Sequence, residues 1–255
     1  MSESRKLLVV TGDDFGFSHG VNEAILRAHK EGILTSASLM VSGDAYPEAV
    51  DYARSNPSLG VGLHLVVGCG RSVLVHRDIP HLVNKRGEFS SYLVAAGLRY
   101  QFSAAARREL KKEIQAQLEK FRRTNLPLSH VDGHHHMHLH PVVLEILIGF
   151  AREYDIRCIR LPSEEWGAIF KRLRRYGEKK CAAAGIDFPE EVYGLLRSGQ
   201  VTEEYLLGLI PQLTSSRVEI YSHPALEKEG ESRNGPHGSG ESELAALLSP
   251  RVRAA

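Results

Sequence analysis

The sequence concentrates histidine between residues 130 and 141, where the stretch HVDGHHHMHLHP holds six imidazoles. Imidazole is a common metal ligand and carries protons near neutral pH. A purification tag does not explain the stretch, because it lies in the interior of the chain between two patterned segments. We therefore interpret it as a metal-binding or catalytic segment whose partners come from elsewhere in the chain.

Polar side chains follow several other predicted strands and could meet this segment. Asp13 and Asp14 come directly after the first apolar run, His64 lies near the end of a later one, and His223 follows a late one. The carboxyl ends of parallel strands meet at one edge of a sheet, where functional groups collect. These residues can therefore converge although they are far apart in the sequence.

Each of these residues also has an ordinary structural interpretation. Adjacent aspartates after a strand are common in turns and helix caps, His64 can be a hydrogen-bonded core histidine, and His223 can be a loop residue. The histidine segment is harder to explain in that way. In an extended loop His134 shares one side with His136 and His138, and in a helical turn with His138, so either form can point His134 toward the strand ends.

One carboxylate and two imidazoles from three strand ends would form a three-ligand site with open coordination positions. Such a site is typical of a hydrolytic metal centre, whereas structural centres are closed. Nitrogen and oxygen ligands together suit Zn²⁺, Mn²⁺, Co²⁺ or Mg²⁺, and the ligand types alone do not choose among them.

The elements that must position these residues alternate between strand and helix. Short apolar or β-branched runs predict strands at Leu7–Thr11, Ile33–Val41, Leu59–Val67, Leu128–Val131, Arg157–Leu161 and Val218–Tyr221. Helical patterns lie between them, around Ala45–Arg54, along the stripe Leu110, Ile114, Leu118 and Phe121, and at Val142–Tyr154 after Pro141.

This alternation predicts an α/β fold, a single-domain (β/α) barrel-like structure over residues 1–255 with parallel strands and outer helices. The region Gly70–Ser103 is longer than a usual connection, so we expect it to lie over the mouth of the site.

Composition narrows the class of protein further. With 42% hydrophobic residues, 25% charged residues and a net charge of +1, the chain lacks a broad attraction to nucleic acid or anionic membranes. It has no apolar run of the ~20 residues that span a bilayer and no signal-peptide pattern at the start. The three cysteines form no paired spacing, which indicates a reducing, cytoplasmic setting. The basic run at residues 171–175 is interpreted as a solvated helix face, with contact to a lipid surface as the alternative.

Several motifs in register resemble the YdjC-like carbohydrate deacetylase family. They are TGDDFGFSHGVNEAI, LGVGLHL, DGHHHMHLHP, IRLPSE and EIYSHPA, and the match runs from residue 6 to about residue 250. Within the family the chain is most similar to the hopanoid-biosynthesis-associated (HpnK) branch, on the segments GRSVLVHRDIPHLVNKRGEF, YQFSAAARRELKKEIQAQ, YGLLRSGQ and ESELAALLSPRVRAA. Family members usually continue beyond the position of Ala255 into a final helix and short strand, so the resemblance implies weaker closing contacts here.

The resemblance implies a barrel-like fold and the removal of acetyl groups from N-acetylated amino sugars with one divalent metal ion, Mg²⁺ or Zn²⁺, with Mn²⁺ and Co²⁺ as alternatives. It places the metal ligands at Asp14, His64 and His134. It also places a general base at Asp13 and a general acid at His223. These are the strand-end residues that the positional argument selects.

Three further residues are weaker candidates for substrate contact. They are Arg160 and Glu164 of the IRLPSE motif, and His138 of the histidine segment. For Arg160 a structural ion pair is the alternative.

The branch implies N-acetylglucosaminyl hopanoid as substrate, giving a glucosaminyl product and acetate, and soluble chito-oligosaccharides such as diacetylchitobiose are the alternative. The apolar segment Gly87–Gln101 is expected to cover the lipid, unless it is an ordinary helix packed on the barrel. The expected partners are thus an amino-sugar substrate, lipid-linked or soluble, a membrane surface contacted peripherally at the inner membrane, and a second copy in a homodimer, but no nucleic acid.

Two other functions are the alternatives to deacetylation. A non-catalytic histidine-rich metal-binding protein would explain the histidine segment, but not the polar residues at the other strand ends. Metal-dependent phosphoester hydrolysis would call for a glycine-rich cradle or clustered basic residues beside the metal, and neither is evident.

Overall fold

The computed structural model describes residues 6–164, 167–229, 231 and 239–255. Its centre is a six-stranded sheet. The strands are β1 (Leu7–Phe15), β2 (Ser36–Leu39), β3 (Gly60–Leu65), β4 (Val131–Gly133), β5 (Glu191–Tyr193) and β6 (Arg217–Ser222). The helices are α1 (His19–Glu31), α2 (Tyr46–Ser55), α3 (Leu93–Phe102), α4 (Ala104–Arg122), α5 (Pro141–Tyr154), α6 (Gly167–Ala184), α7 (Glu203–Leu209), α8 (Ser239–Leu248) and α9 (Pro250–Ala254), with 3₁₀ turns η1 (His134–Leu139) and η2 (Ile210–Gln212).

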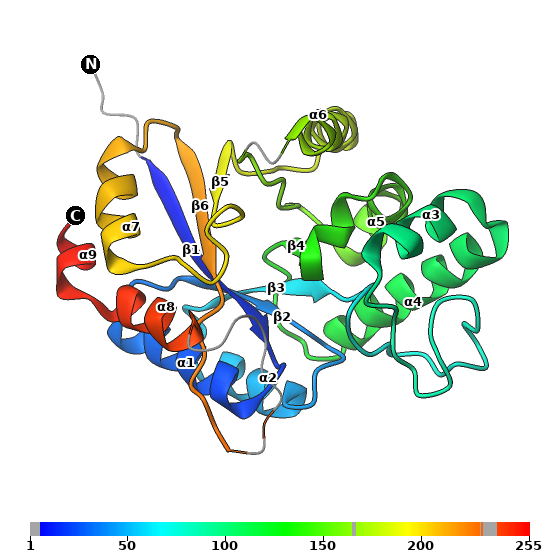
Figure 1. Cartoon of the computed structure of the whole chain (residues 1–255), viewed down its shortest axis with the longest axis horizontal. Coiled ribbons are helices and arrows are strands. Elements are labelled where there is room, and N and C mark those ends of the chain that lie inside the picture. Colours follow the sequence, from blue (N-terminus) through cyan, green and yellow to red (C-terminus); the bar gives the residue numbers. More distant parts are fainter. Residues whose placement is uncertain (1–5, 165–166, 230, 232–238) are drawn as a thin grey trace.

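All pairings in the sheet are parallel, and the strand order is β4-β3-β2-β1-β6-β5. The sheet curls into a half-barrel with helices around it (Figure 1). Because every strand runs in the same direction, the carboxyl ends of β1, β3, β4 and β6 lie along one edge. This architecture confirms the predicted α/β fold with parallel strands and outer helices.

Local chemistry explains where the helices begin. Ser18 caps α1 by accepting a hydrogen bond from the Val21 amide at 3.3 Å, and Ser103 caps α4 in the same way. Pro141 is the first residue of α5, as predicted, because its missing N–H and fixed φ suit the start of a helix. The predicted stripe on α4 is buried in the core, at Leu110, Ile114, Leu118 and Phe121.

One segment between β4 and β5 in the sequence was predicted to be a strand but has a different structure. The expected strand Arg157–Leu161 forms only isolated bridges: the Val131 amide donates to the Cys158 carbonyl at 2.9 Å, and the Ile159 amide donates to the Asp187 carbonyl at 3.0 Å. This segment is therefore extended but irregular. Its hydrogen bonds join Val131 of β4 on one side to Asp187, which precedes β5, on the other. Strand β5 itself was not predicted, because three residues carry too little periodicity to be recognised.

The long region after β3 is held against α4 by polar residues on the inward face of that helix. Glu113 accepts hydrogen bonds from the amides of Val73 at 2.7 Å and Leu74 at 2.9 Å, and Glu109 accepts one from the His81 amide at 2.8 Å. This region ends in α3, whose first residue reaches the site described below. Among the helices of the described residues, none is long and apolar enough to cross a membrane.

Candidate active site

The end of β1 is irregular, and this irregularity aims two successive carboxylates. The register with β2 shifts between Gly12 and Phe15, and Asp14 adopts a φ of 64°, which is uncommon for a residue other than glycine. In a regular strand Asp13 and Asp14 would point to opposite faces. Here both line the same cavity, and both are buried.

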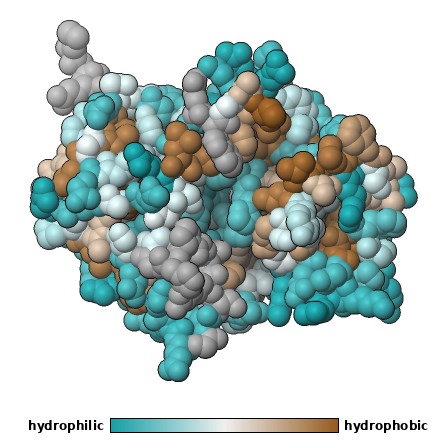
Figure 2. All heavy atoms as spheres, viewed as in Figure 1, coloured by the Kyte–Doolittle hydropathy of each residue, from teal (hydrophilic) through white to brown (hydrophobic). Residues whose placement is uncertain are grey.

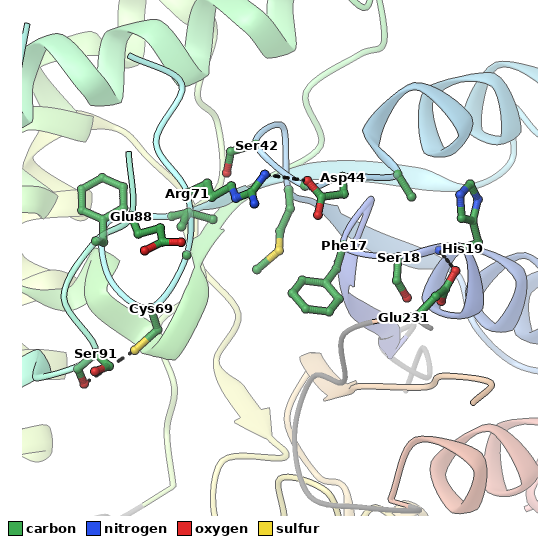
Figure 3. Close-up of a pocket in the computed structure, with 16 residues that line it drawn as sticks. Phe17, Ser18, His19, Ser42, Asp44, Cys69, Arg71, Glu88, Ser91 and Glu231 are labelled. Carbon is green, nitrogen blue, oxygen red and sulfur yellow. Dashed lines mark hydrogen bonds and ion pairs between the residues drawn. The ribbon is translucent and has the colours of Figure 1, made fainter. Parts of the chain in front are cut away.

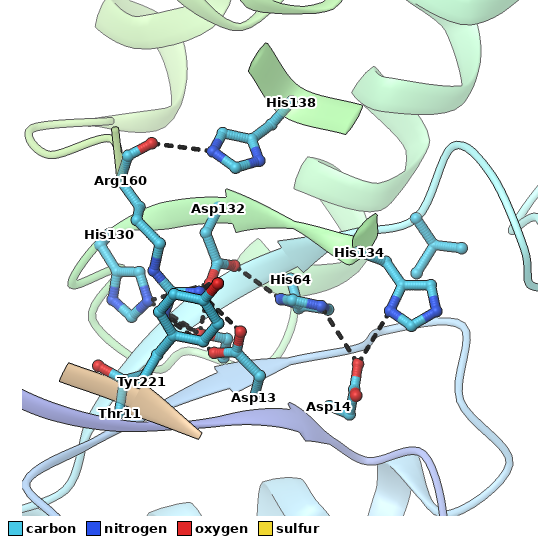
Figure 4. A network of polar contacts seen from close by, with 12 residues as sticks. Thr11, Asp13, Asp14, His64, His130, Asp132, His134, His138, Arg160 and Tyr221 are labelled. Atoms are coloured by element: carbon cyan, nitrogen blue, oxygen red, sulfur yellow. Dashed lines mark hydrogen bonds and ion pairs between the residues drawn. The ribbon is translucent and has the colours of Figure 1, made fainter. Parts of the chain in front are cut away.

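Asp14 meets the two predicted histidine ligands. Its Oδ1 lies 3.2 Å from Nε2 of His64, on β3, and 3.1 Å from Nδ1 of His134, at the start of η1 (Figure 4). All three side chains are buried, and their ligand atoms are close enough together to hold one metal ion. The structure therefore brings together the three residues predicted to bind a metal.

The hydrogen bonds of His64 indicate whether Asp14, His64 and His134 are suited to bind a cation. Nδ1 of His64 lies 2.9 Å from Oδ1 of Asp132, so in a neutral ring that nitrogen carries the proton. The lone pair of Nε2 then faces the Asp14 carboxylate, an arrangement that is favourable only with a proton or a cation between them. A carboxylate bonded to the far side of a histidine ligand is a common feature of metal sites. The donor set thus fits a divalent metal ion.

Electrostatics agree with this geometry. Burial by itself would lower the pKa of His64, but the carboxylates of Asp132 and Asp14 raise it well above its usual range. Burial by itself would raise the pKa of Asp14, but His134 and His64 hold it well below its usual range. The protein therefore stabilises positive charge between these side chains.

A second grouping, Asp13, His64 and Asp132, is also compact, but a guanidinium already neutralises it. Nη1 of Arg160 lies 2.7 Å from Oδ2 of Asp13 and 2.6 Å from Oδ2 of Asp132, and its Nη2 lies 2.8 Å from Oε1 of Glu219. A further cation there would be repelled by Arg160. The grouping that contains Asp14 is therefore the better metal site.

The buried charges at the site also favour a metal ion beside Asp14. Four buried carboxylates lie at this site. The guanidinium of Arg160 contacts three of them, Asp13, Asp132 and Glu219, and Asp14 faces His64 and His134 instead. Burying unbalanced negative charge is costly. A divalent ion beside Asp14 would reduce that imbalance.

The cavity above these residues has a volume of about 270 Å³. Its lining includes all five residues assigned to catalysis or metal binding, namely Asp13, Asp14, His64, His134 and His223. Apolar side chains also line it from two sides, Leu93 at the start of α3 and Leu195 after β5. The polar residues thus form one wall of a cavity that is partly apolar at its rim.

The three weaker candidates for substrate contact are Arg160, Glu164 and His138. None of them is among the described residues that line the cavity, and each contacts residues next to its wall. Arg160 holds both oxygens of Asp13, at 2.7 and 2.9 Å, so the ion pair expected as its alternative role is present. His138 is buried, and its Nε2 lies 2.8 Å from the Arg160 carbonyl oxygen. Glu164 accepts a hydrogen bond from the Gly194 amide at 2.9 Å and so orders the loop that contains Leu195.

The histidine segment is neither an extended loop nor a regular helical turn. His135 and His136 adopt left-handed backbone conformations with φ of 50° and 56° inside the 3₁₀ turn. His135 is exposed, with its ring 4.2 Å from that of His134, while Nε2 of His136 lies 3.0 Å from the Tyr221 hydroxyl. Of the histidines in this segment, His134 alone belongs to the metal-binding group.

Sequence reasoning missed the roles of Asp132 and Glu219. Asp132 lies directly opposite His64 in the register of β3 and β4, which no single-strand pattern reveals. Glu219 lies inside the apolar run of β6, and a charged residue at a buried strand position is a signal that could have identified it.

A larger cleft, of about 630 Å³, opens at the same edge of the sheet (Figure 3). Phe17 follows β1, Asp44 follows β2, and Arg71 and Glu88 come from the long region after β3. Nη1 of Arg71 lies 3.3 Å from Oδ1 of Asp44 across this cleft. Its lining therefore mixes aromatic and charged groups.

The buried Asp-His-His group, which could hold a metal ion, thus lies at the strand ends of a parallel α/β half-barrel, where enzymes of this architecture carry their active sites. The chain belongs to the YdjC-like family, because the family model described as YdjC-like protein matches residues 7–255. This membership confirms the family seen in the motifs.

Individual relatives agree with it. The chain is 43% identical over 221 residues to the carbohydrate deacetylase of Brevibacillus brevis, a match that covers 86% of this chain and 81% of that protein. It is 35% identical over 219 residues to the carbohydrate deacetylase of Geobacillus stearothermophilus, covering 85% and 78%. Among solved structures, an Enterococcus faecalis protein with a proposed role in cellobiose-phosphate cleavage shares the fold, with a TM-score of 0.79, 24% identity, and coverage of 98% of this chain and 94% of that one.

Proposed function

We propose that this protein is a metal-dependent hydrolase that removes the N-acetyl group from N-acetylated amino sugars. The observation that carries this proposal is the cavity in which the group Asp14, His64 and His134 faces both Asp13 and His223. Hydrolysis of an amide needs an activated water, a base and an acid, and this cavity offers residues for each. The relatives named carbohydrate deacetylase support the same reaction.

A divalent ion held by Asp14, His64 and His134 would activate water and polarise the acetamide oxygen. Two imidazole ligands suit Zn²⁺ better than Mg²⁺, which prefers oxygen. Asp13 takes the proton of the attacking water. Arg160 fixes both oxygens of Asp13 without exhausting their acceptor capacity, because each carboxylate oxygen can accept more than one hydrogen bond.

His223 gives a proton to the sugar nitrogen as the carbon–nitrogen bond breaks, leaving acetate and a free amine. Its location suits this role, because β1 and β6 are paired in register up to Gly12 and Ser222. Asp13 and His223 are the next residues along these neighbouring strands. The base and the acid therefore come from adjacent positions at the sheet edge.

Within this activity we infer that the substrate is lipid-linked, with N-acetylglucosaminyl hopanoid as the candidate that the family branch implies. Support comes from α3, where Val94, Leu98 and Phe102 are 80%, 56% and 78% exposed and share one face of the helix. The opposite face of α3 packs on the core through Ala96 and Tyr100. An exposed apolar patch of this kind marks a contact with a lipid or another partner.

The apolar face of α3 begins at the mouth of the site, since Leu93, its first residue, lines the cavity. In Figure 2 hydrophobic residues gather over α3, beside the hollow at the centre of the face. A sugar in the cavity would thus place an attached lipid along this helix, with the protein bound peripherally at the inner surface of a membrane. The expected cytoplasmic location and homodimer stay predictions.

A soluble chito-oligosaccharide such as diacetylchitobiose remains the second candidate, and the larger cleft is the feature that favours it. Its charged and aromatic lining, including Phe17, Asp44 and Arg71, suits a second sugar unit better than a lipid. A non-catalytic metal-binding protein is disfavoured, because it leaves Asp13 and His223 beside the metal group without a role.

The test is acetate release by the Zn²⁺-loaded protein from N-acetylglucosaminyl hopanoid in phosphatidylcholine vesicles and from N,N′-diacetylchitobiose. We expect a higher kcat/KM for the glycolipid, and no release from either substrate by Asp14→Ala. A preference for diacetylchitobiose would contradict the lipid-linked substrate but not the deacetylase. Absence of acetate from both substrates would contradict the deacetylase itself.

A further inference from the structure

A buried carboxylate lies behind the wall of the active-site cavity. Glu243 of α8 is 0% exposed, and its Oε2 accepts a hydrogen bond from the backbone amide of His223 at 2.6 Å. Its Oε1 accepts a second hydrogen bond from the backbone amide of Val201 at 3.0 Å. A carboxylate buried to this degree is costly unless its oxygens are hydrogen-bonded, so these contacts fix it in one position.

The two segments that Glu243 holds both form walls of the cavity. His223 lines it after β6, and Ser198 and Gly199 line it shortly before Val201. One carboxylate therefore sets the distance between two walls. His223 is the first residue beyond β6, so its backbone position depends on contacts other than the strand ladder.

Helix α8 is itself firmly placed. Leu244 and Leu247 are buried in the core, and the Leu247 carbonyl accepts a hydrogen bond from the Ile33 amide at 3.1 Å. The Gly240 carbonyl accepts one from the Ala225 amide at 3.1 Å, and a Cβ atom at Gly240 would lie only 2.6 Å from the Cβ of Ala225. The helix thus holds the segment after β6 at two points, His223 and Ala225.

We propose that Glu243 is a positioning residue for the general acid, which acts by fixing the backbone of His223 so that its imidazole faces the departing nitrogen. This inference rests on the proposed function, in which His223 protonates the amine as the carbon–nitrogen bond breaks. The reason is geometric. A displacement of about 1 Å between reacting groups can lower a rate by about 100-fold.

The variant Glu243→Gln tests this proposal, because it keeps the shape of the side chain but replaces one acceptor oxygen with an NH₂ donor. That donor would face a backbone N–H, so one of the two hydrogen bonds is lost. We expect kcat on an N-acetyl amino sugar to fall about 10- to 100-fold, with KM and bound metal unchanged.

A second substrate separates positioning from general damage. 4-Nitrophenyl acetate has a leaving group that departs without a proton, so it does not need the general acid. Glu243→Gln should therefore change the rate of ester cleavage by less than about twofold. In the His223→Ala background, Glu243→Gln should add little to the loss of amide hydrolysis, because both substitutions act through one group.

Glu113→Gln is a matched control. Glu113 is also a buried helical glutamate that accepts two backbone amides, those of Val73 and Leu74, but it holds a loop that does not line this cavity. Both variants should lower Tm, but Glu113→Gln should leave the ratio of amide to ester rates unchanged. If Glu243→Gln does not fold, Glu243→Asp, which keeps both acceptors but shortens the side chain, undergoes the same measurements.

Two results would overturn the positioning role: equal losses on amide and ester, or full additivity with His223→Ala. Both results can be interpreted only when the wild-type protein hydrolyses the amide. A wild-type protein that releases no acetate contradicts the proposed function, whereas an active one with an unchanged rate ratio in the Glu243 variants contradicts only the role of Glu243.

Discussion

His64 of β3 and Asp132 of β4 are direct partners across the parallel sheet, with Nδ1 of His64 2.9 Å from Oδ1 of Asp132. Asp132 is held in turn by Arg160, whose Nη1 lies 2.6 Å from its other oxygen. The strand register therefore sets the orientation of the imidazole and turns Nε2 toward Asp14. Asp132 lies outside the metal-binding group with Asp14 but controls one of its ligands.

From this pairing we predict that Asp132→Asn weakens metal binding about 10- to 100-fold without removing a ligand, as is usual for such supporting carboxylates. His134→Ala should lose the metal, and His135→Ala, the matched neighbour, should keep it. Competition with a chelator and elemental analysis measure both. Equal metal loss in the two histidine variants, or wild-type affinity in Asp132→Asn, would contradict this assignment.

Asp13→Asn and His223→Ala should each lower kcat/KM about 10²- to 10⁴-fold, the usual value of a general base or acid. Neither residue belongs to the preferred metal group, so both variants should keep their metal, whereas His64→Ala should lose metal and activity together. Activity and bound metal are measured on the same preparations. A metal-free Asp13→Asn, or wild-type kcat/KM in His223→Ala, would overturn these roles.

Arg160→Met should destabilise the protein by about 3–5 kcal/mol, because it leaves buried carboxylates without their cation. Arg157→Met is the control: that side chain is 79% exposed and pairs with Asp155 at the surface, where an ion pair contributes little to stability. Urea unfolding of the metal-free proteins gives both values. Similar small losses in the two variants would show that the buried network does not depend on Arg160.

The sequence predicted the parts of this site that depend on strand ends. Asp14, His64 and His134 follow or end apolar runs, and parallel topology brings such positions to one edge. It did not predict the contact of Asp132 with His64 or the place of Glu219 in the network, since both depend on which strands are neighbours and in what register. Arg160 and Asp13 are 147 positions apart in the sequence, and no local pattern predicts such a contact.

The secondary structure was also predicted only in part. Long periodic elements such as α4 and α5 were predicted, because an amphipathic stripe is visible in the sequence itself. Strand β5 was not predicted, and the strand predicted at Arg157–Leu161 forms only isolated bridges at Cys158 and Ile159, because tertiary pairing decides whether a few extended residues become a strand. The left-handed residues His135 and His136 are likewise held by their surroundings and not by local preference.

Glu113 gives a prediction about pH. Burial raises the pKa of its carboxyl group, and the amides of Val73 and Leu74 offset this only in part. Because the folded-state pKa lies above the unfolded value of about 4.3, the stabilisation is complete below that pH and is lost as pH rises through the folded pKa. The free energy of unfolding of the wild type, relative to Glu113→Gln, should therefore decline as pH rises above about 4. Urea unfolding across this range measures it, and a difference that grows with pH would contradict the sign.

The apolar face of α3 gives the last prediction. Burying one side chain such as Leu98 contributes about 1.5–3 kcal/mol, so losing a single contact of this size weakens binding about tenfold or more. The triple variant Val94→Ser, Leu98→Ser, Phe102→Ser should therefore lower kcat/KM for the glycolipid in vesicles at least about tenfold. Hydrolysis of diacetylchitobiose should not change, because these side chains point away from the core and do not line the cavity.

Leu7→Ser is the control for this experiment, since Leu7 is 58% exposed but lies at the opposite end of β1 from the site. It removes one exposed leucine, as Leu98→Ser does within the triple variant, and should leave the rates on both substrates unchanged. Co-sedimentation with phosphatidylcholine vesicles gives a second reading that does not depend on catalysis. If the triple variant sediments and deacetylates the glycolipid as the wild type does, α3 does not contact the lipid, and the larger cleft beside Phe17 becomes the place to look for the rest of the substrate.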